Sequence, residues 1–347
     1  MRIRCRELVL GAALCLALSG ISRAQEALEA PSGERGWWVA EVADQVCVRD
    51  RMGETSSCWP QSLGQVTSLR ETAAGWIAAG SRAVDRELFL FRNAGNGLEV
   101  IAPPSGGTTP RGRPALIADE TRLQGLVWLE GVSQDVLEVR AAEWLGASWS
   151  EVATVSPAGP GSQVAPAVTV LDDGSWLLVW TAFDGEDDET VWSLYDHGRW
   201  SAPGLLNEDN TTPDIVPAVL STKRGAIAAW SWLDGRDYRL RTAFFNGTSW
   251  RLDPPFAGRG ALGVRLADVF GTILLSFETV VPEQWVIIEL DATGRALRRA
   301  SLAHPGGERP LVASEGSEAV FSWLDGESTR EVAVVWDSVD ESKEQGQ

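Results

Sequence analysis

Carboxylate side chains crowd one short turn of this chain. The run Asp184-Gly185-Glu186-Asp187-Asp188-Glu189 holds five acidic residues in six positions. Calcium binds through oxygen ligands, so it is the one cofactor that this turn admits. The run lacks the spacing of a known calcium loop, and a solvated acidic turn is the favoured interpretation. The sequence therefore predicts no cofactor, with calcium as the sole exception.

Other residue types that perform chemistry are scarce. The chain has two tyrosines, Tyr195 and Tyr238, and two histidines, neither of which is close in sequence to a cysteine pair. That pair, Cys47 and Cys58, remains once an N-terminal leader has been removed. An even pair in an exported chain predicts one disulfide that closes a hairpin, rather than a metal site.

The N-terminus has the pattern of an export signal. Three arginines precede an apolar run from Leu8 to Leu18, and a small-x-small cleavage site follows at Ser22-Arg23-Ala24. The apolar run is too short to span a bilayer. We predict a signal peptide at residues 1–24, cleaved after its last residue, and a linker at residues 25–35. The mature protein is then secreted or periplasmic, without membrane insertion.

The charge of the chain restricts its partners. The formal net charge is −18, and no cluster of Lys and Arg stands out. Nucleic acid is excluded as a partner, because its phosphates need such clusters. A strongly acidic surface favours solubility and cationic partners, with a merely solvated surface as the favoured interpretation of the two.

Two stretches of the chain repeat one pattern about fifty residues apart. Pro166-Ala167-Val168 recurs as Pro217-Ala218-Val219 after 51 positions, and Trp180 recurs as Trp230 after 50. An apolar strand and an Asp-Gly pair recur with them. Self-similarity at this period indicates small sheets that cannot bury their faces alone.

Each unit contains four strand-like stretches, separated by turns rich in Asp and Gly. In the central copy these stretches are Val164–Leu171, Ser175–Ala182, Thr190–Tyr195 and Trp200–Leu205. Four-stranded sheets in tandem predict an all-β fold, a β-propeller of residues 36–339. The charged segment at residues 340–347 reads as a disordered acidic tail.

Large aromatic residues end the second strand of several units. At these strand ends a flat side chain can fill the space between adjacent blades. We predict that they belong to the core and do not stack on a ligand. The residues are Trp128, Trp180, Trp230 and Trp323.

The number of blades depends on the two ends of the chain. Inner-strand openings recur six times, and the last unit, from Pro310, has three strands. Trp59-Pro60-Gln61-Ser62-Leu63 resembles the fourth strand at Trp200–Leu205. We predict six blades, with the ring closed by the N-terminal segment as the missing strand of the last blade. Seven blades, with Trp37–Leu63 as a partial blade, is the alternative.

These units resemble the degenerate repeats of bacterial sialidase-like propellers, of the BNR or Asp-box type. The resemblance runs from about Val66 to Trp336 and rests on Pro-Ala-Val, a strand ending in Trp, Asp-Gly, and Gly-x-Trp or Gly-x-x-Trp. The Asp-box, Ser-x-Asp-x-Gly-x-Thr-Trp, is not intact, although Asp196-His197-Gly198-Arg199-Trp200 keeps its Asp and Gly. Such motifs specify a fold far better than an activity.

The resemblance also implies what a catalytic site would need. A sialidase uses an arginine cluster, a tyrosine nucleophile with a glutamate partner, and an aspartate acid/base. Arg113-Pro114 matches only part of the family's Arg-Ile-Pro motif, and we assign no catalytic residue. The sequence predicts an exported, non-catalytic module of the cell envelope or secretome that binds a glycan or a protein. A sialidase-like glycoside hydrolase and a structural or assembly subunit of an envelope complex are the alternatives.

The predicted ligand-binding residues are acidic and lie in turns. In a four-stranded blade, the turns between the second and third strands emerge on one face with the loops between blades. Long loops on a rigid scaffold usually carry binding groups, so we assign the site to this face, around the central opening. A cationic ligand would suit it. The residues are Glu130, Asp184, Asp188, Asp234, Asp237 and Asp325.

Overall fold

The computed structural model describes residues 37–339, with gaps at 43, 51–53, 83, 94–96, 106–108, 134–135, 157–160, 209, 257–258, 304–309 and 326–327. The predicted signal peptide, linker and C-terminal tail lie outside these residues. The described part is all-β and contains, besides strands, one 3₁₀ turn, η1 (Gln61–Leu63).

The strands form seven antiparallel sheets, which we number in chain order. Sheet 1 contains β1 (Trp38–Val42), β2 (Gln45–Arg49) and β3 (Thr55–Pro60). Sheet 2 contains β4 (Gln65–Thr72), β5 (Gly75–Ser81), β6 (Leu88–Asn93) and β7 (Leu98–Ile101). Sheet 3 contains β8 (Arg111–Ala118), β9 (Leu123–Gly131), β10 (Leu137–Glu143) and β11 (Ala153–Thr154).

The two central repeats make the next two sheets. Sheet 4 contains β12 (Gln163–Val170), β13 (Trp176–Phe183), β14 (Asp188–Asp196), β15 (Arg199–Trp200) and β16 (Gly204–Leu205). Sheet 5 contains β17 (Asp214–Thr222), β18 (Gly225–Asp234), β19 (Asp237–Phe245) and β20 (Trp250–Leu252).

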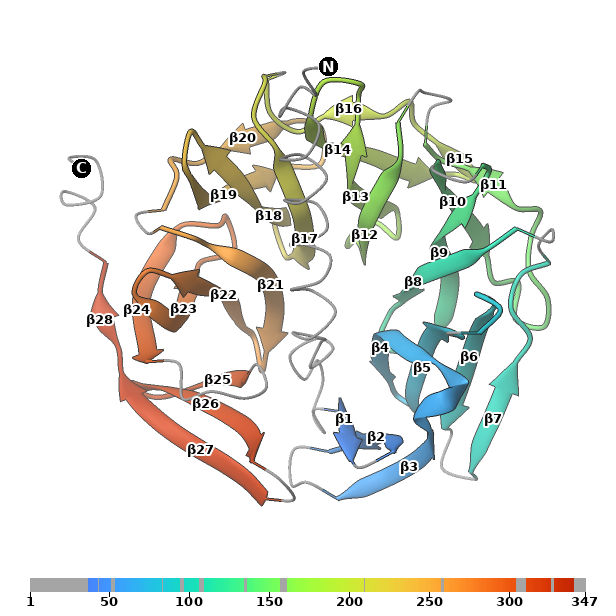
Figure 1. Cartoon of the computed structure of the whole chain (residues 1–347), viewed down its shortest axis with the longest axis horizontal. Helices are drawn as coiled ribbons and strands as arrows, with labels where there is room; N and C mark the ends of the chain where they lie inside the picture. Colours follow the sequence, from blue (N-terminus) through green and yellow to red (C-terminus); the bar gives the residue numbers. More distant parts are fainter. Residues whose placement is uncertain are drawn as a thin grey trace, which may run out of the picture.

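The C-terminal part makes the last two sheets. Sheet 6 contains β21 (Leu262–Val269), β22 (Thr272–Val280), β23 (Glu283–Leu290), β24 (Ala296–Ala303) and β28 (Asp337–Ser338). Sheet 7 contains β25 (Leu311–Glu315), β26 (Glu318–Asp325) and β27 (Ser328–Val335). Figure 1 shows the sheets following one another around a circle in chain order, with sheet 1 between sheets 7 and 2, which is the arrangement of a β-propeller.

The preferred count of six blades is wrong for the described residues, because the N-terminal segment forms a sheet of its own. Strand β3 pairs with β2, in a hairpin whose register places Cys47 opposite Cys58. The segment is not the fourth strand of sheet 7, whose described order is β25-β26-β27. Trp59 instead packs against sheet 2, with ring centroids 6.3 Å from Trp76 and 5.3 Å from Phe91. Burial of this large ring on sheet 2 explains why the segment pairs where it does.

The predicted disulfide is confirmed. Cys47 on β2 and Cys58 on β3 are bonded, and their Cα atoms lie 4.1 Å apart. The bridge closes the hairpin of β2, the middle strand of sheet 1, and β3, one of its edge strands.

The predicted core role of the repeated tryptophans is also confirmed. Trp128, Trp180 and Trp230 have no exposed surface, and Trp323 is 8% exposed. Each belongs to the apolar cluster shared with the preceding sheet, as Trp180 does with Val127 and Val139 of sheet 3. The repeat therefore places one large ring at every one of these sheet boundaries.

The central copy differs from its prediction in the outermost strand. The expected strand at Trp200–Leu205 is split into β15 and β16, both of which pair with β14. Pro203 lies between them and has no N–H to donate. The Leu194 N–H donates to the Ser201 hydroxyl at 3.0 Å and is therefore not used on a backbone carbonyl of the outer strand. The ladder therefore breaks for these residues and then resumes.

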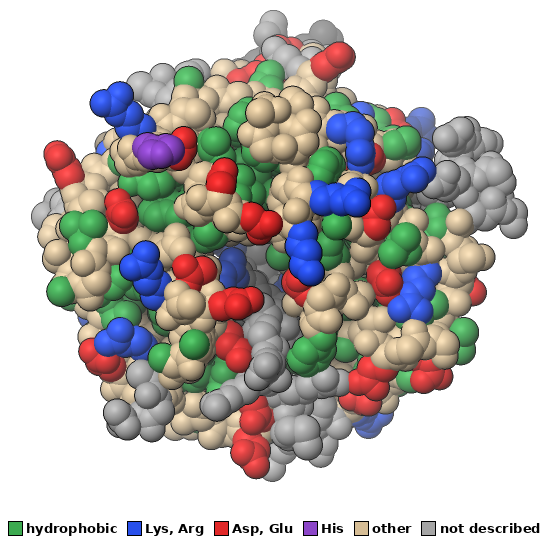
Figure 2. Space-filling view, turned by 180° about the vertical axis from the view of Figure 1, so that it is seen from behind, with side chains coloured by type: hydrophobic (Ala, Val, Ile, Leu, Met, Phe, Trp, Pro, Cys, Tyr) green, Lys and Arg blue, Asp and Glu red, His purple; other side chains and the backbone are tan. Residues whose placement is uncertain are grey.

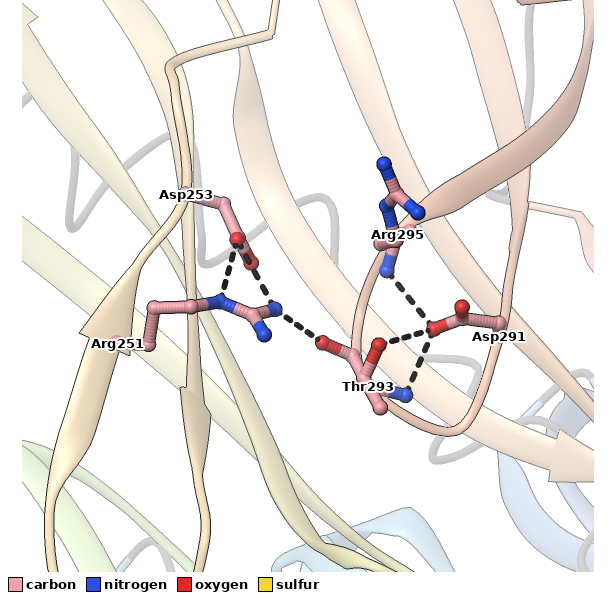
Figure 3. Close-up of polar contacts among 5 residues, drawn as sticks. All are labelled: Arg251, Asp253, Asp291, Thr293 and Arg295. Carbon is pink, nitrogen blue, oxygen red and sulfur yellow. Dashed lines mark hydrogen bonds and ion pairs between the residues drawn. The ribbon is translucent and has the colours of Figure 1, made fainter.

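Polar contacts at the outer rim join sheets 5 and 6. Arg251 on β20 pairs with Asp253 at 3.1 Å, and its Nη2 donates to the Thr293 carbonyl in the β23–β24 turn at 2.8 Å. That turn is shaped by Asp291, whose Oδ1 accepts the N–H groups of Thr293 and Arg295 and the Thr293 hydroxyl (Figure 3). Arg251 thus links one sheet to the turn of the next.

Candidate functional site

A large cavity lies at the centre of the ring. Its volume is about 1710 Å³, and its wall is made by the inner strands β4, β8, β12, β17 and β21 and the turns that follow four of them. Figure 2 shows a hollow in the middle of one face, with acidic and basic side chains around it. A concave site with convergent polar groups is where ligands usually bind.

Side chains of both charges line this cavity. Arginines come from three different sheets: Arg70 on β4, Arg113 on β8 and Arg265 on β21. Carboxylates also belong to the lining, most of them in or beside the turns after the inner strands. They are Glu71, Asp119, Glu120, Asp172 and Asp268.

Arg70 places a positively charged guanidinium in the wall of the cavity. Burial lowers the pKa of Arg70 to about 10, so the guanidinium stays protonated at neutral pH. Its Nη2 reaches the carbonyl of Val168 on β12 at 3.5 Å, and its Nη1 donates to the Leu69 carbonyl at 3.4 Å. The positive charge of Arg70 therefore extends from the inner strand of sheet 2 to the inner strand of sheet 4.

The wall also carries repeated backbone strain. The ladders of β8, β12 and β17 each shift register at the residue before the Pro-Ala pair. Arg113, Ala165 and Val216 occupy these bulges with φ of 50°, 50° and 52°, in the left-handed region. Proline cannot donate to the ladder, so the motif that recurs in the sequence is a β-bulge. Such strain clusters at functional sites, which supports a role for this wall.

Neighbouring side chains hold these bulges in place. The Thr67 hydroxyl donates to the Pro114 carbonyl at 2.8 Å, and the Val216 N–H donates to the Thr181 hydroxyl at 3.0 Å. The strained wall is therefore fixed from the adjacent sheets before any ligand arrives.

Both tyrosines lie away from the residues that line the cavity. Tyr195 stacks on Trp176 with ring centroids 4.2 Å apart, and its hydroxyl donates to Glu143 Oε2 at 3.0 Å. Burial, reinforced by Glu143, raises the pKa of Tyr195 to about 12. Burial likewise raises the pKa of Tyr238, with a contribution from Asp188. The raised pKa values leave both hydroxyls less ionised at neutral pH than a free tyrosine, although Glu143 is placed to accept the Tyr195 proton as a general base.

The six predicted binding residues lie at one end of sheets 3, 4, 5 and 7, beside the turns between second and third strands. They are spread over four sheets, and none belongs to the cavity lining. Glu130 accepts the Trp128 Nε1–H at 3.1 Å, Asp234 pairs with Arg239 at 2.8 Å, and Asp237 lies 3.7 Å from Arg259. These contacts neutralise part of the charge on which the prediction depends.

Sequence reasoning missed how deeply some acidic residues are buried beside that face. Asp187 is 4% exposed, Glu189 1%, and Asp214 is fully buried, between sheets 4 and 5. One signal was available for Asp214, because it stands where the preceding repeat has Gln163, at the start of the inner strand. The same position carries Arg111 in sheet 3, three residues before its Pro-Ala pair, so its charge changes from one sheet to the next while the strand start is kept.

The described residues contain no cluster of three or more His, Cys, Asp or Glu side chains placed to hold a metal ion. Within the same part of the chain, no helix is long and apolar enough to cross a membrane.

Comparisons with known proteins identify a fold but no family. Neither protein-family models nor curated protein sequences match the chain. Among solved structures, a prolyl endopeptidase aligns over 95% of this chain and 54% of its own, with 14% identity and a TM-score of 0.52. A putative 6-phosphogluconolactonase from Bacteroides uniformis aligns over 89% of this chain and 94% of its own, with 11% identity and a TM-score of 0.51.

A fungal lectin from Aleuria aurantia, a six-bladed β-propeller, aligns over 79% of this chain and 92% of its own, with 13% identity and a TM-score of 0.49. The alignment with the prolyl endopeptidase, by contrast, covers only about half of the length of that protein. At identities this low the likeness concerns the fold alone.

Proposed function

We propose that this chain is an exported, non-catalytic binding module, a closed propeller that holds part of a glycan or of a protein in its central cavity. Residues 1–24 act as a signal peptide that is removed after Ala24. The Cys47–Cys58 disulfide fits an extracellular or periplasmic location. Sheet 1 closes the ring between sheets 7 and 2.

One observation carries this proposal. The cavity brings arginines from three sheets and carboxylates from several turns onto one wall, at a ring of strained bulges. Paired donors and acceptors of both charges suit a polar, hydroxyl-rich ligand such as a glycan. Both tyrosines, and with them the Tyr195–Glu143 pair, stand outside this wall, which favours binding over tyrosine-dependent hydrolysis in the cavity.

The test begins with capture of a ligand on a glycan array and by pull-down from an envelope extract. Arg113→Ala then removes one charge from the wall, and the chain supplies the reason that this variant folds. Ala165 already occupies the equivalent bulge with the same φ of 50°. We expect binding to weaken by at least about ten-fold with the melting temperature unchanged. Equal capture by wild type and variant would remove the cavity as the site.

A sialidase-like glycoside hydrolase stands as the second candidate, because three arginines line one cavity. Release of free sugar from a glycan array by the wild type, abolished in Arg113→Ala, would replace the binding function with this activity.

The acidic turns are the alternative location for the ligand. Reversing the charge of four residues in these turns tests them together: Asp184, Asp188, Asp234 and Asp325. If this variant loses a salt-sensitive partner that Arg113→Ala retains, the ligand binds the turns and not the cavity.

A further inference from the structure

The boundary between sheets 4 and 5 contains a buried network of oxygen-bearing side chains. Asp187 ends the β13–β14 turn, Glu189 follows on β14, Asn207 lies between β16 and β17, and Asp214 begins β17. Their exposed fractions are 4%, 1%, 7% and 0%. Charged residues are almost never buried to this degree unless they are paired or bind a metal.

Hydrogen bonds tie the two sides of this boundary together. Asn210 Nδ2 donates to Glu189 Oε1 at 3.1 Å and to Asp214 Oδ2 at 3.2 Å. Asn207 Nδ2 donates to Asp214 Oδ2 at 2.7 Å, and Trp230 Nε1 donates to Asp214 Oδ1 at 2.6 Å. The amide N–H groups are thus used on carboxylates, and the network is rigid before any ion arrives.

Both carboxylate oxygens of Asp187 and the Oδ1 atom of Asn207 are buried in this network without a hydrogen bond. Asn207 donates to Asp214, and the charge of Asp214 contributes to the raised pKa of Asp187, so both side chains lie near Asp214. A buried carboxylate without donors is strongly disfavoured when ionised.

The charges around Asp187 increase this penalty. Its own turn contributes Asp184, Glu186 and Asp188, and β17 contributes Asp214. Burial, then these four charges, raise the pKa of Asp187 to about 6. Burial raises the pKa of Asp214, and its hydrogen bonds and Arg241 on β19 oppose that shift only in part; the Arg241 guanidinium lies over the Trp232 ring at 3.7 Å. Asp187 thus combines burial, acidic neighbours and two oxygens without hydrogen bonds, an environment that a cation would compensate.

We propose that this boundary binds one hard divalent cation of the Ca²⁺ class, with the Asp187 carboxylate and Asn207 Oδ1 as ligands. Glu189 and Asp214 supply further negative charge. Calcium accepts carboxylate and amide oxygens together with backbone carbonyls and water, in six- to eight-fold coordination. The described residues form no cluster of three acidic ligands, so carbonyls and water complete the sphere. A donor set of oxygens alone disfavours zinc.

This inference stands apart from the proposed function, since it concerns a boundary between sheets and not the cavity. A cation held by Asp187 of sheet 4 and Asn207, which leads into sheet 5, would bridge the two sheets. Binding to the folded state alone would then raise stability by mass action.

The probes are Ca²⁺ in thermal unfolding and Tb³⁺ in luminescence, both on the full mature chain. Tb³⁺ reports on this place because Trp230, in contact with Asp214, can sensitise its emission. Three proteins are compared: the wild type, Asp187→Asn, and Asp234→Asn as a control at the matching turn of sheet 5. Asp187→Asn keeps the shape of the side chain and removes its charge.

For the wild type and the control, we expect about 10 mM Ca²⁺ to raise the melting temperature by about 3–6 °C over an EDTA solution. Asp187→Asn should shift by less than about 1 °C and lose at least about five-fold of the Tb³⁺ signal. In EDTA at pH 7.5, Asp187→Asn should be at least as stable as the wild type, which excludes simple misfolding. The proposal is overturned if Ca²⁺ leaves the wild type unchanged, or if Asp187→Asn responds as the wild type does.

Discussion

Two neighbouring boundaries of this ring bury the same tryptophan of the repeat, and they differ in the residue that accepts its hydrogen bond. Between sheets 3 and 4, Trp180 donates its Nε1–H to Gln163 Oε1 at 2.6 Å. Between sheets 4 and 5, Trp230 donates to Asp214 Oδ1, also at 2.6 Å. Both rings are fully buried. Both boundaries contain a buried indole that donates a hydrogen bond. The acceptor is a neutral amide at the first boundary and a carboxylate at the second.

The indole and its hydrogen bond stabilise the fold at both boundaries, whereas the carboxylate is specific to the boundary between sheets 4 and 5. A neutral acceptor satisfies the indole and needs no further compensation. The carboxylate at the second boundary is surrounded by Asn207, Asn210 and further acidic residues, an arrangement that the first boundary does not need. Repeats therefore preserve packing, and chemistry enters where one copy departs from the other.

Removal of the shared ring should have the largest effect. We expect Trp180→Ala and Trp230→Ala each to lower the free energy of unfolding by about 3–5 kcal/mol, because each empties a packed boundary. Trp230→Ala should cost more, since it leaves a carboxylate oxygen without its donor, whereas Trp180→Ala leaves a neutral amide. Denaturant unfolding of the pair measures this order, and equal losses would show that the acceptor's charge does not matter.

The pH dependence of stability should distinguish the two boundaries next. The pKa of Asp187 is raised to about 6 in the folded protein, so the native state holds a proton that the unfolded chain has already lost. The stability from that proton is complete below about pH 4 and is lost as pH rises through about 6. In EDTA, the wild type should lose about 1–2 kcal/mol relative to Asp187→Asn between pH 4 and 7.5.

Asp234→Asn serves as the control in the same titration. It should keep the loss of stability that the wild type shows as pH rises through about 6, because it leaves Asp187 and its buried surroundings unchanged. Parallel curves for Asp187→Asn and the wild type would show that Asp187 does not carry the effect.

A third boundary, between sheets 5 and 6, should show a smaller effect because its polar link is at the rim. Arg251→Ala removes the bond to the Thr293 carbonyl and the charge beside Asp253, whose pKa burial already raises. We expect a loss of about 1 kcal/mol in urea unfolding. Arg251→Lys should recover only part of this stability, since one ammonium group cannot reproduce the planar set of donors by which the guanidinium contacts Asp253 and the Thr293 carbonyl together.

The strained bulges should give the smallest change, of opposite sign. Ala165→Gly should stabilise the protein by about 0.5–1 kcal/mol, because glycine adopts its φ of 50° without strain. The same change at Ala167, two residues along β12 and outside the left-handed region, should destabilise it. If both variants lose stability, the bulge is not strained.

The sequence predicted those parts of the molecule that depend on local pattern. The sheets of the central repeats, the burial of Trp128, Trp180 and Trp230, and the Cys47–Cys58 bridge follow from strand period, residue size and cysteine count. Such features require only contacts that every copy of the unit makes in the same way.

Features that depend on distant contacts could not be predicted in this way. Trp59-Pro60 resembles the outer strand at Trp200, but the hairpin and disulfide of sheet 1 fix its partner, and packing on Trp76 fixes its position. Asp187 lies between exposed Glu186 and half-buried Asp188, and only the adjacent sheet buries it. No pattern within one turn distinguishes these three carboxylates.

The binding function is tested most directly by the affinity of a captured ligand for two variants that separate the cavity from the acidic turns. One is Arg113→Ala, and the other combines charge reversal at Asp184, Asp188, Asp234 and Asp325. Titration calorimetry should give a Kd at least about ten-fold weaker for Arg113→Ala and within about two-fold of the wild type for the combined variant. A combined variant that loses the ligand while Arg113→Ala binds it as tightly as the wild type would contradict a site in the central cavity.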